Sequence, residues 1–358
     1  MRIASIVGAR PNFVKLAPVS REIRRDSEEL IIHTGQHYDY QMDKIFFKEL
    51  GIPEPDYHLG VGSGSHGQQT GEMLRGIEDV LLKEKPDTAL VFGDTNTTLA
   101  GALAAAKLHI PVAHVEAGLR SFYKEMPEEV NRVLVDHCSD LLFCPTRTAV
   151  DNLKKEGIVK GVHLTGDVMA DILKDCIRIA EKSSKILDLL DLRPKGYYLA
   201  TVHRAENTDD PRRLKSIIEA LCQIDDVVFP CHPRTEKRLQ EEGLWDKLNE
   251  EVNITKPVGY LEMLLLEKNA KKILTDSGGV QKEAYMLKVP CVTMRDETEW
   301  VETVEDGWNV LVGADKEKIF RAAGSFDPHI EQREMFGRGD ASKRIVQAIL
   351  EGITKMKS

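Results

Sequence analysis

The sequence predicts an α/β protein with two doubly wound parallel sheets, each covered by helices, that face each other across a cleft. Short β-rich runs alternate with helical patterns from one end of the chain to the other, which is typical of such sheets. The chain has 358 residues, enough for two domains. Polar residues also gather where the predicted strands end, and ligands lie beyond those carboxyl ends.

Twelve segments are predicted to be strands, too many for one comfortable sheet, so we divide them into two sets of six. They are Ile3–Val7, Leu30–His33, Thr88–Phe92, Val112–Val115, Leu141–Cys144, Val162–Thr165, Tyr197–Val202, Val227–Cys231, Val252–Lys256, Lys272–Thr275, Cys291–Met294 and Val310–Val312. The resulting domains are residues 1–168 and 195–338, with a helical connection at 169–194 and a final helix at 339–358.

The composition is that of a globular protein, with 42% hydrophobic and 30% charged residues. A net charge of −9 argues against nucleic-acid and membrane-surface binding. No apolar run approaches the roughly 18 residues of a membrane span, and the start of the chain is no signal peptide, so we expect a cytoplasmic protein. The six cysteines include no CxxC pair, which argues against a zinc site; Cys144, Cys231 and Cys291 are expected to be buried, with a catalytic cysteine as the alternative.

Residues 271–284 are predicted to form a strand, a glycine turn and the start of a helix. Ser277, Gly278 and Gly279 make the turn, and the free N–H groups of the helix could bind a diphosphate there. Glu283, over one turn further on, could accept the two hydroxyls of a ribose. Gly278→Val is therefore expected to weaken UDP binding with little change in melting behaviour. The alternative is an ordinary tight turn with a surface Glu.

Three residues follow the first and third predicted strands. Arg10 and Lys15 flank the first turn and could meet one anion, or they could be solvated surface cations. Asp94 follows the third strand and could be a helix N-cap; one carboxylate among Thr and Asn is a poor magnesium site.

Glu116 follows an apolar strand, where partial desolvation would raise its proton affinity and suit it to acid–base chemistry. The alternative is that Glu116 pairs with Arg120. His114 in the same strand is expected to be a hydrogen-bonded core residue. Residues 127–132 are predicted to begin a helix with Pro and acidic residues in its first turn.

His203 and Arg204 end a strongly apolar strand in the second half of the chain. A histidine beside an arginine at such a place is suited to meeting an anion or moving a proton. His33 and His37 straddle a strand end and a glycine, so they are not expected to form a metal pair.

Six linked motifs give the chain a resemblance to a known family. They are residues 8–11 (GARP), 93–98 (GDTNTT), 114–120 (HVEAGLR), 127–132 (PEEVNR), 203–207 (HRAEN) and 275–279 (TDSGG). Together they resemble the non-hydrolysing UDP-N-acetylglucosamine 2-epimerases, from Arg2 to about Ile349. The resemblance implies a glycosyltransferase-B-type fold with two Rossmann-like domains, a last helix that returns to the first domain, a homodimer, a UDP-sugar substrate, and no metal or nicotinamide cofactor.

The resemblance also implies a reaction and its residues. The reaction inverts C2 of UDP-N-acetylglucosamine to give UDP-N-acetylmannosamine, by elimination of UDP to 2-acetamidoglucal and re-addition. Asp94, Glu116 and Glu128 match acid–base carboxylates, without an assignment of base and acid, and His203 matches a catalytic cleft histidine. The substrate-binding positions are Arg10, Lys15, Arg204, Val258, Met263, Ser277, Gly278, Gly279 and Glu283.

The chain departs from the family in two places. Trp300 stands where many members have an arginine, in a run that resembles a sister group, the 2-epimerases for UDP-2,3-diacetamido-2,3-dideoxyglucuronate. That sugar is the alternative substrate, and a glycosyltransferase on the same fold is a further alternative. Gln36 and His37 match a motif linked to activation by substrate, but residues 38–40 do not, so allosteric control is not predicted.

Overall fold

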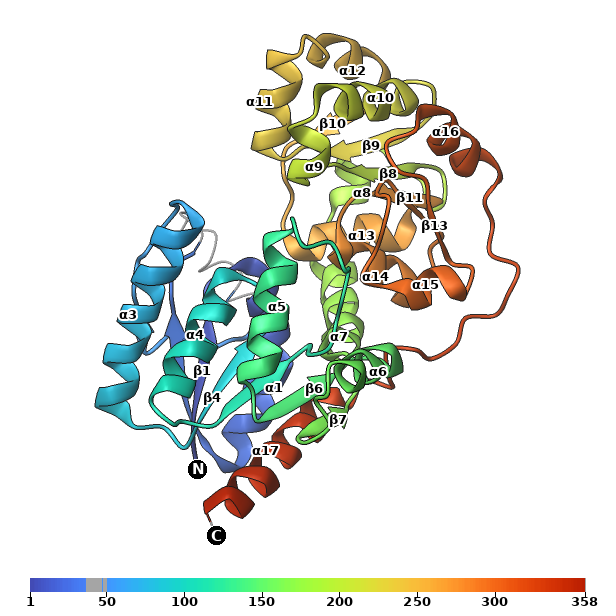
Figure 1. The fold of residues 1–358 in the computed structure, drawn as a ribbon. Coiled ribbons are helices and arrows are strands. Elements are labelled where there is room, and N and C mark those ends of the chain that lie inside the picture. The colour runs from blue at the N-terminus through green and yellow to red at the C-terminus, as the bar shows by residue number, and fades with distance from the viewer. Residues whose placement is uncertain (37–46, 48–49, 358) are drawn as a thin grey trace. The chain divides into compact units, whose positions relative to one another are not determined.

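The structure is a computed structural model that describes residues 1–36, 47 and 50–357 (Figure 1). The chain divides into two compact units, one made of residues 1–172 and 334–358 and the other of residues 173–333. Within the described residues, no helix has both the length and the apolar character that a membrane crossing needs.

The first unit is built on a seven-stranded parallel sheet of order β3-β2-β1-β4-β5-β6-β7. Its strands are β1 (Arg2–Val7), β2 (Glu28–His33), β3 (Tyr57–His58), β4 (Thr88–Phe92), β5 (Val112–Val115), β6 (Leu141–Cys144) and β7 (Val162–Leu164). Its helices are α1 (Arg10–Asp26), α3 (His66–Glu84), α4 (Asn96–Lys107), α5 (Pro127–Cys138), α6 (Arg147–Lys155) and α17 (Ala341–Lys357); α7 (Val168–Ser183) crosses the boundary between the units. The strand order runs outward in both directions from β1 and β4, as in a doubly wound sheet.

The second unit is built on a six-stranded parallel sheet of order β10-β9-β8-β11-β12-β13. Its strands are β8 (Tyr198–Thr201), β9 (Val227–Pro230), β10 (Asn253–Thr255), β11 (Lys272–Thr275), β12 (Cys291–Thr293) and β13 (Asn309–Leu311). Its helices are α8 (Ile186–Leu189), α9 (Ala205–Thr208), α10 (Pro211–Leu221), α11 (Pro233–Glu241), α12 (Trp245–Glu251), α13 (Tyr260–Asn269), α14 (Gly278–Met286), α15 (Val301–Glu305) and α16 (Lys316–Ser325). The expected pair of doubly wound parallel sheets is therefore confirmed.

All twelve predicted strands are present, each within about two residues of its predicted ends. The division into two sets of six is wrong for the first sheet, which has β3 as a seventh, edge strand. That strand consists of two residues, Tyr57 and His58, and neither is buried. It is too short to give the apolar run or alternation by which strands are recognised in a sequence.

Local sequence explains how helices pack on each sheet. In α4 a Cβ on Gly101 would lie 3.0 Å from Val91 and 3.1 Å from Ile6, so the glycine lets this helix approach β4 and β1 closely. In α10 the apolar residues Leu214, Ile217, Ile218 and Leu221 recur at helical spacing and join the core of the second unit.

The last helix, α17, belongs to the first unit. It packs against α1, and the carboxylate of Asp171 accepts hydrogen bonds from the first N–H groups of α17, at Ala341 (3.1 Å) and Ser342 (2.7 Å). An acidic side chain at a helix N-terminus is favourable because the free N–H groups carry partial positive charge.

Candidate active site

The carboxyl ends of β1, β4 and β5 bring Lys15 and Glu116 together. These strands are neighbours in the sheet, and Lys15 of α1 forms an ion pair with Glu116 although 101 positions separate them in the sequence. Both side chains are buried. Gly93, at the end of β4, has a φ of +67°, and a Cβ there would lie 2.8 Å from the Lys15 ammonium nitrogen and 3.3 Å from Glu116 Oε2. The glycine therefore makes room for the pair.

Glu116 itself has an unusual backbone. Its φ is +74°, in the left-handed region that residues with a side chain rarely adopt. Such a conformation costs on the order of 1–3 kcal/mol and is found most often at functional sites. Its N–H donates to Phe143 O at 3.1 Å, which holds the residue at the end of β5. The strained backbone, together with the buried ion pair with Lys15, makes Glu116 a candidate functional residue.

Asp94 pairs with Arg132 of α5 and is half-buried. It is not the N-cap of α4, as its alternative interpretation proposed, because Thr95 takes that place and accepts a hydrogen bond from the Thr98 N–H. The side-chain amide of Asn131 donates to Asp94 O at 2.9 Å. Helix α5 therefore orients both the backbone and the side chain of Asp94.

The predicted helix start at Pro127 is confirmed, and its two acidic residues differ. Glu129 is buried and accepts hydrogen bonds from Ser121 N and Phe122 N, each at 2.9 Å. Glu128 is half-buried, and no hydrogen bond or ion pair joins it to another residue in the described part of the chain. Glu129 therefore has a structural role, and Glu128 is the one whose carboxylate is available for contact with a substrate.

A buried network lies behind Glu116. His114 is fully buried and contacts Asp136 Oδ1 and Gly93 O, each at 2.8 Å, which confirms it as a hydrogen-bonded core residue. Arg120 bonds Asp136 at 2.7 Å and Glu156 at 2.7 Å, so the alternative interpretation, in which Glu116 pairs with Arg120, is wrong. Burial alone would raise the pKa of Asp136, but the His114 hydrogen bond and the Arg120 charge outweigh it and lower that pKa.

The glycine turn of the second unit follows β11. Helix α14 begins at Gly278, and the hydroxyl of its N-cap, Ser277, accepts a hydrogen bond from Val280 N. Gly278 is buried, and a Cβ there would lie 2.0 Å from Glu299 Oε1. Gly279 is exposed, and a Cβ there would have only Ser277 Oγ nearby, at 3.8 Å. Gly278 is thus closely packed against Glu299, whereas Gly279 faces open space. The contact argues against a small effect of Gly278→Val on melting, and that effect stays a prediction.

Two arginines surround Glu299 beside this turn. Arg295 Nη1 lies 2.9 Å from Glu299 Oε2, and Arg204 Nη2 lies 3.9 Å from Glu299 Oε1. Because Arg295 and Glu299 are both buried, their charges are only weakly screened by solvent. The predicted ligand Arg204 is therefore placed at the turn by residues that sequence reasoning did not assign to the site.

Asp276, just before the turn, organises His203 and Arg204. The buried carboxylate accepts hydrogen bonds from His203 N (3.1 Å), Arg204 N (3.0 Å) and the Asn207 amide (3.2 Å). The His203 ring stays partly exposed, with Nδ1 at 3.6 Å from Asp276 Oδ1. Sequence reasoning missed Asp276, although its position between β11 and the glycine turn was a usable signal.

The remaining predicted ligands lie on α13 and α14 or outside what the structure describes. Glu283 is buried on α14. Burial of Tyr260, followed by the charge of Glu283 and its hydrogen bond, raises the pKa of Tyr260 well above its ordinary value. Val258 and Met263 are half-buried, just before and within α13. Arg10 begins α1, but its side chain lies outside the described part of the structure, as does all of His37.

The three cysteines expected in strands are buried at Cys144, Cys231 and Cys291, and burial raises the pKa of each thiol. A thiol of high pKa is a poor nucleophile near neutral pH. The interpretation as packed apolar side chains is confirmed.

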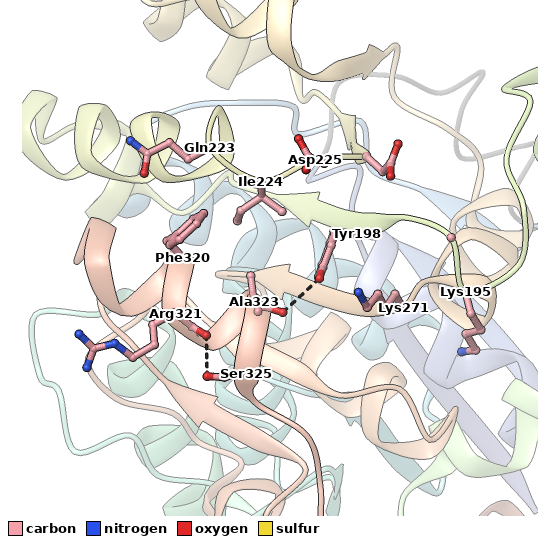
Figure 2. A pocket seen from close by; sticks show the side chains of 13 residues that line it. Lys195, Tyr198, Gln223, Ile224, Asp225, Lys271, Phe320, Arg321, Ala323 and Ser325 are labelled. Atoms are coloured by element: carbon pink, nitrogen blue, oxygen red, sulfur yellow. Dashed lines mark hydrogen bonds between the residues drawn. The ribbon is translucent and has the colours of Figure 1, made fainter.

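An open pocket of about 620 Å³ lies elsewhere on the second unit (Figure 2). It is lined at the start of β8 and β11 by Tyr198 and Lys271 and on α16 by Phe320 and Arg321. These are the amino ends of the strands, and none of the predicted site residues lines it. Ligands of parallel sheets lie at the carboxyl ends, so we place the candidate site there and not in this pocket.

These features define the class of the protein. Two parallel doubly wound units, with carboxylates at the strand ends of one and a glycine turn at a helix N-terminus in the other, are those of an α/β enzyme with a glycosyltransferase-B-type fold. The chain belongs to the UDP-N-acetylglucosamine 2-epimerase family, whose model matches residues 21–350.

Relatives and solved structures support this assignment. A Methanococcus maripaludis protein named UDP-N-acetylglucosamine 2-epimerase homolog is 60% identical, over 98% of this chain and 99% of its own. The Pseudomonas aeruginosa UDP-2,3-diacetamido-2,3-dideoxy-D-glucuronate 2-epimerase is 53% identical, over 97% of this chain and 99% of its own. The crystal structure of Methanocaldococcus jannaschii UDP-GlcNAc 2-epimerase, in complex with UDP-GlcNAc and UDP, is 51% identical with a TM-score of 0.93, over 98% and 100%.

Proposed function

We propose that this protein inverts C2 of UDP-N-acetylglucosamine to give UDP-N-acetylmannosamine. The observation that carries the proposal is the geometry at the end of β5, where Glu116 adopts a strained left-handed backbone and its carboxylate is paired with Lys15. A neighbouring cation favours the ionised carboxylate, and a buried position limits solvent around it. A glycosyltransferase on the same fold needs no carboxylate set for removing a C2 proton.

The proposed reaction runs by elimination and re-addition. A carboxylate takes the proton from C2, the bond between C1 and the UDP oxygen breaks, and UDP and 2-acetamidoglucal form. Re-addition of UDP to C1 and return of a proton to the opposite face of C2 complete the inversion. We propose Asp94, Glu116 and Glu128 as the acid–base set and His203 as a further catalytic residue. Several carboxylates in one site titrate as a coupled set.

The second unit supplies the proposed nucleotide site. The diphosphate is placed at the first turn of α14, where Ser277 and Gly279 lead into free N–H groups with partial positive charge. The ribose is placed at Glu283, and Arg10, Lys15, Arg204, Val258, Met263 and Gly278 complete the proposed substrate-binding set. We further propose that the enzyme works as a cytoplasmic homodimer in polysaccharide biosynthesis, without a metal or nicotinamide cofactor, with residues 169–194 joining its two domains.

A second candidate substrate is UDP-2,3-diacetamido-2,3-dideoxyglucuronate. Two observations favour it: the 53% identity with the Pseudomonas aeruginosa enzyme and Trp300 in place of an arginine. A site that pairs the extra polar groups of this sugar could discriminate against a sugar lacking them by up to ~10⁴-fold.

The test is to compare kcat/KM for the two UDP-sugars with no cofactor added. We expect conversion of UDP-N-acetylglucosamine, and we expect Glu116→Gln to abolish it while the fold is retained. A ratio that strongly favours the uronate would make that sugar the substrate, and absence of C2 inversion with either sugar would contradict the proposal.

A further inference from the structure

The buried ring of His114 faces a hydrogen-bond acceptor at each of its two nitrogens. Nδ1 lies 2.8 Å from Asp136 Oδ1, and Nε2 lies 2.8 Å from Gly93 O. Burial would raise the pKa of Asp136, but its contacts with His114 and Arg120 lower that pKa, so the carboxylate is ionised. An ionised carboxylate and a carbonyl oxygen can only accept, so both ring nitrogens must donate. His114 is therefore an imidazolium inside the first unit.

The charge of this imidazolium is balanced within a buried chain of ionic groups. Asp136 Oδ2 accepts a hydrogen bond from Arg120 Nη1 at 2.7 Å. Arg120 Nη2 in turn donates to Glu156 Oε2 at 2.7 Å. Cations and carboxylates alternate along the chain, so each buried charge has a neighbour of opposite sign, as a buried charge requires.

The same carboxylate fixes the backbone on both sides of Glu116. His114 lies two residues before Glu116 and contacts Asp136 Oδ1. Gly118 lies two residues after Glu116 and donates its N–H to Asp136 Oδ2 at 3.1 Å. Glu116, between them, has a φ of +74°, and a strained backbone persists only where the surrounding contacts determine it. Asp136 therefore holds the turn that presents the Glu116 carboxylate.

His114 also fixes the end of the neighbouring strand β4. The Gly93 N–H donates to Val115 O at 3.0 Å, and Gly93 O accepts from His114 Nε2, so two residues of β5 hold this glycine. Gly93 directly precedes Asp94, and a Cβ on Gly93 would lie 3.3 Å from Glu116 Oε2. The position of Gly93 thus sets both the backbone of Asp94 and the space beside Glu116.

We propose that His114 and Asp136 are positioning residues for the inversion at C2, and that their buried ion pair keeps the Asp94 and Glu116 carboxylates in place for proton transfer. This proposal rests on the proposed function. Both side chains of the pair are fully buried, so they act through the two carboxylates and not on the sugar. A displacement of about 1 Å at a reacting group can lower a rate by about 100-fold.

The test compares His114→Asn with His114→Gln. The asparagine amide can bond Asp136 from near the position of Nδ1 but falls short of Gly93 O, whereas the glutamine amide nitrogen can reach Gly93 O from near the position of Nε2. With UDP-N-acetylglucosamine, kcat should fall about 100-fold in His114→Asn and stay within about 10-fold of wild type in His114→Gln. Calorimetric affinity for UDP should be unchanged in both, because the diphosphate and ribose are placed on the second unit.

A matched control and a direct measurement accompany the two variants. His163→Asn changes a half-buried histidine on β7 of the same sheet, and its kcat should equal that of wild type. A neutron crystal structure of wild type should show hydrogen on both ring nitrogens of His114 and none on the Asp136 carboxylate. This measurement holds even where His114→Asn does not fold.

Wild-type kcat in a folded His114→Asn, at whatever stability, would assign the network to folding alone and overturn the proposal. A folded His114→Gln as slow as His114→Asn would also overturn it, as would hydrogen on only one His114 nitrogen. The proposed function fails in a different way. If wild type inverts neither UDP-sugar although both His114 nitrogens carry hydrogen, the imidazolium stands and the epimerase assignment fails.

Discussion

Alanine at Gly278 and at Gly279 should affect folding and binding in opposite ways. In Gly278→Ala the new Cβ would lie 2.0 Å from Glu299 Oε1, so the Glu299 carboxylate must shift, and this disturbs its ion pair with Arg295. Removing one partner of a buried ion pair costs about 3–5 kcal/mol, which sets an upper limit on the cost of disturbing this pair. In Gly279→Ala the Cβ meets only Ser277 Oγ at 3.8 Å, and alanine in place of helical glycine stabilises by up to about 1 kcal/mol.

The assay joins urea unfolding to calorimetric titration with UDP. Gly278→Ala should lose about 3 kcal/mol of unfolding free energy, the lower end of that range, because Glu299 can partly relax. Gly279→Ala should be as stable as wild type or slightly more so, yet bind UDP about 10-fold more weakly because its methyl occupies the phosphate approach. Wild-type affinity in Gly279→Ala would refute the placement of the diphosphate, and wild-type stability in Gly278→Ala would refute the packing argument.

Three further predictions concern the first unit and the cysteines. Glu116→Gln should lower kcat by at least about 100-fold while UDP affinity stays near wild type, and an unchanged kcat would exclude Glu116 from catalysis. Because the folded-state pKa of Asp136 lies below its ordinary 3.8, its stabilisation is present above that pH and lost as the pH falls further. Urea unfolding from about pH 5 to pH 3 should therefore show a steeper loss of stability in wild type than in Asp136→Asn, whereas parallel curves would contradict this. Burial raises the pKa of Cys231 and Cys291 to about 12, so both should resist maleimide at pH 7 in the folded protein; mass spectrometry showing rapid labelling of either would refute this.

Most of the fold could be predicted from the sequence because buried parallel strands are apolar runs with distinct ends. Strands such as β4 and β8 consist of four or five residues, nearly all buried, between turn and helix signals. Strand β3 lacked that signal because its two residues lie at the sheet edge and are not buried. The other strands could be recognised in the sequence mainly because they are buried and therefore apolar, and less because of their strand propensity.

The site was predictable as a set of strand ends but not as a set of contacts. Glu116 was recognised, yet the one partner that the sequence suggested for it, as an alternative interpretation, was Arg120, four residues away. The partner is Lys15, because the order β1-β4-β5 brings the ends of distant segments together. Glu299 likewise reaches Gly278 from 21 positions further along the chain, a contact that no local pattern encodes.

The role of Asp94 shows a local rule overridden by tertiary structure. An Asp between a strand and a helix is a good N-cap candidate, but the cap is Thr95. The Asp94 carboxylate instead forms an ion pair with Arg132, which lies on the following helix, α5. The functional assignment of Asp94 thus rests on the resemblance, and the structure adds the cation that orients it.

The proposed mechanism requires that the protein removes and returns the proton at C2 of a UDP-sugar. The most direct test is incubation of the enzyme with UDP-N-acetylglucosamine in D₂O, followed by NMR of both epimers. We predict deuterium at C2 of UDP-N-acetylglucosamine and UDP-N-acetylmannosamine with no cofactor added, and no deuterium at C2 with the Glu116→Gln variant. Inversion with full retention of the original C2 hydrogen would contradict it.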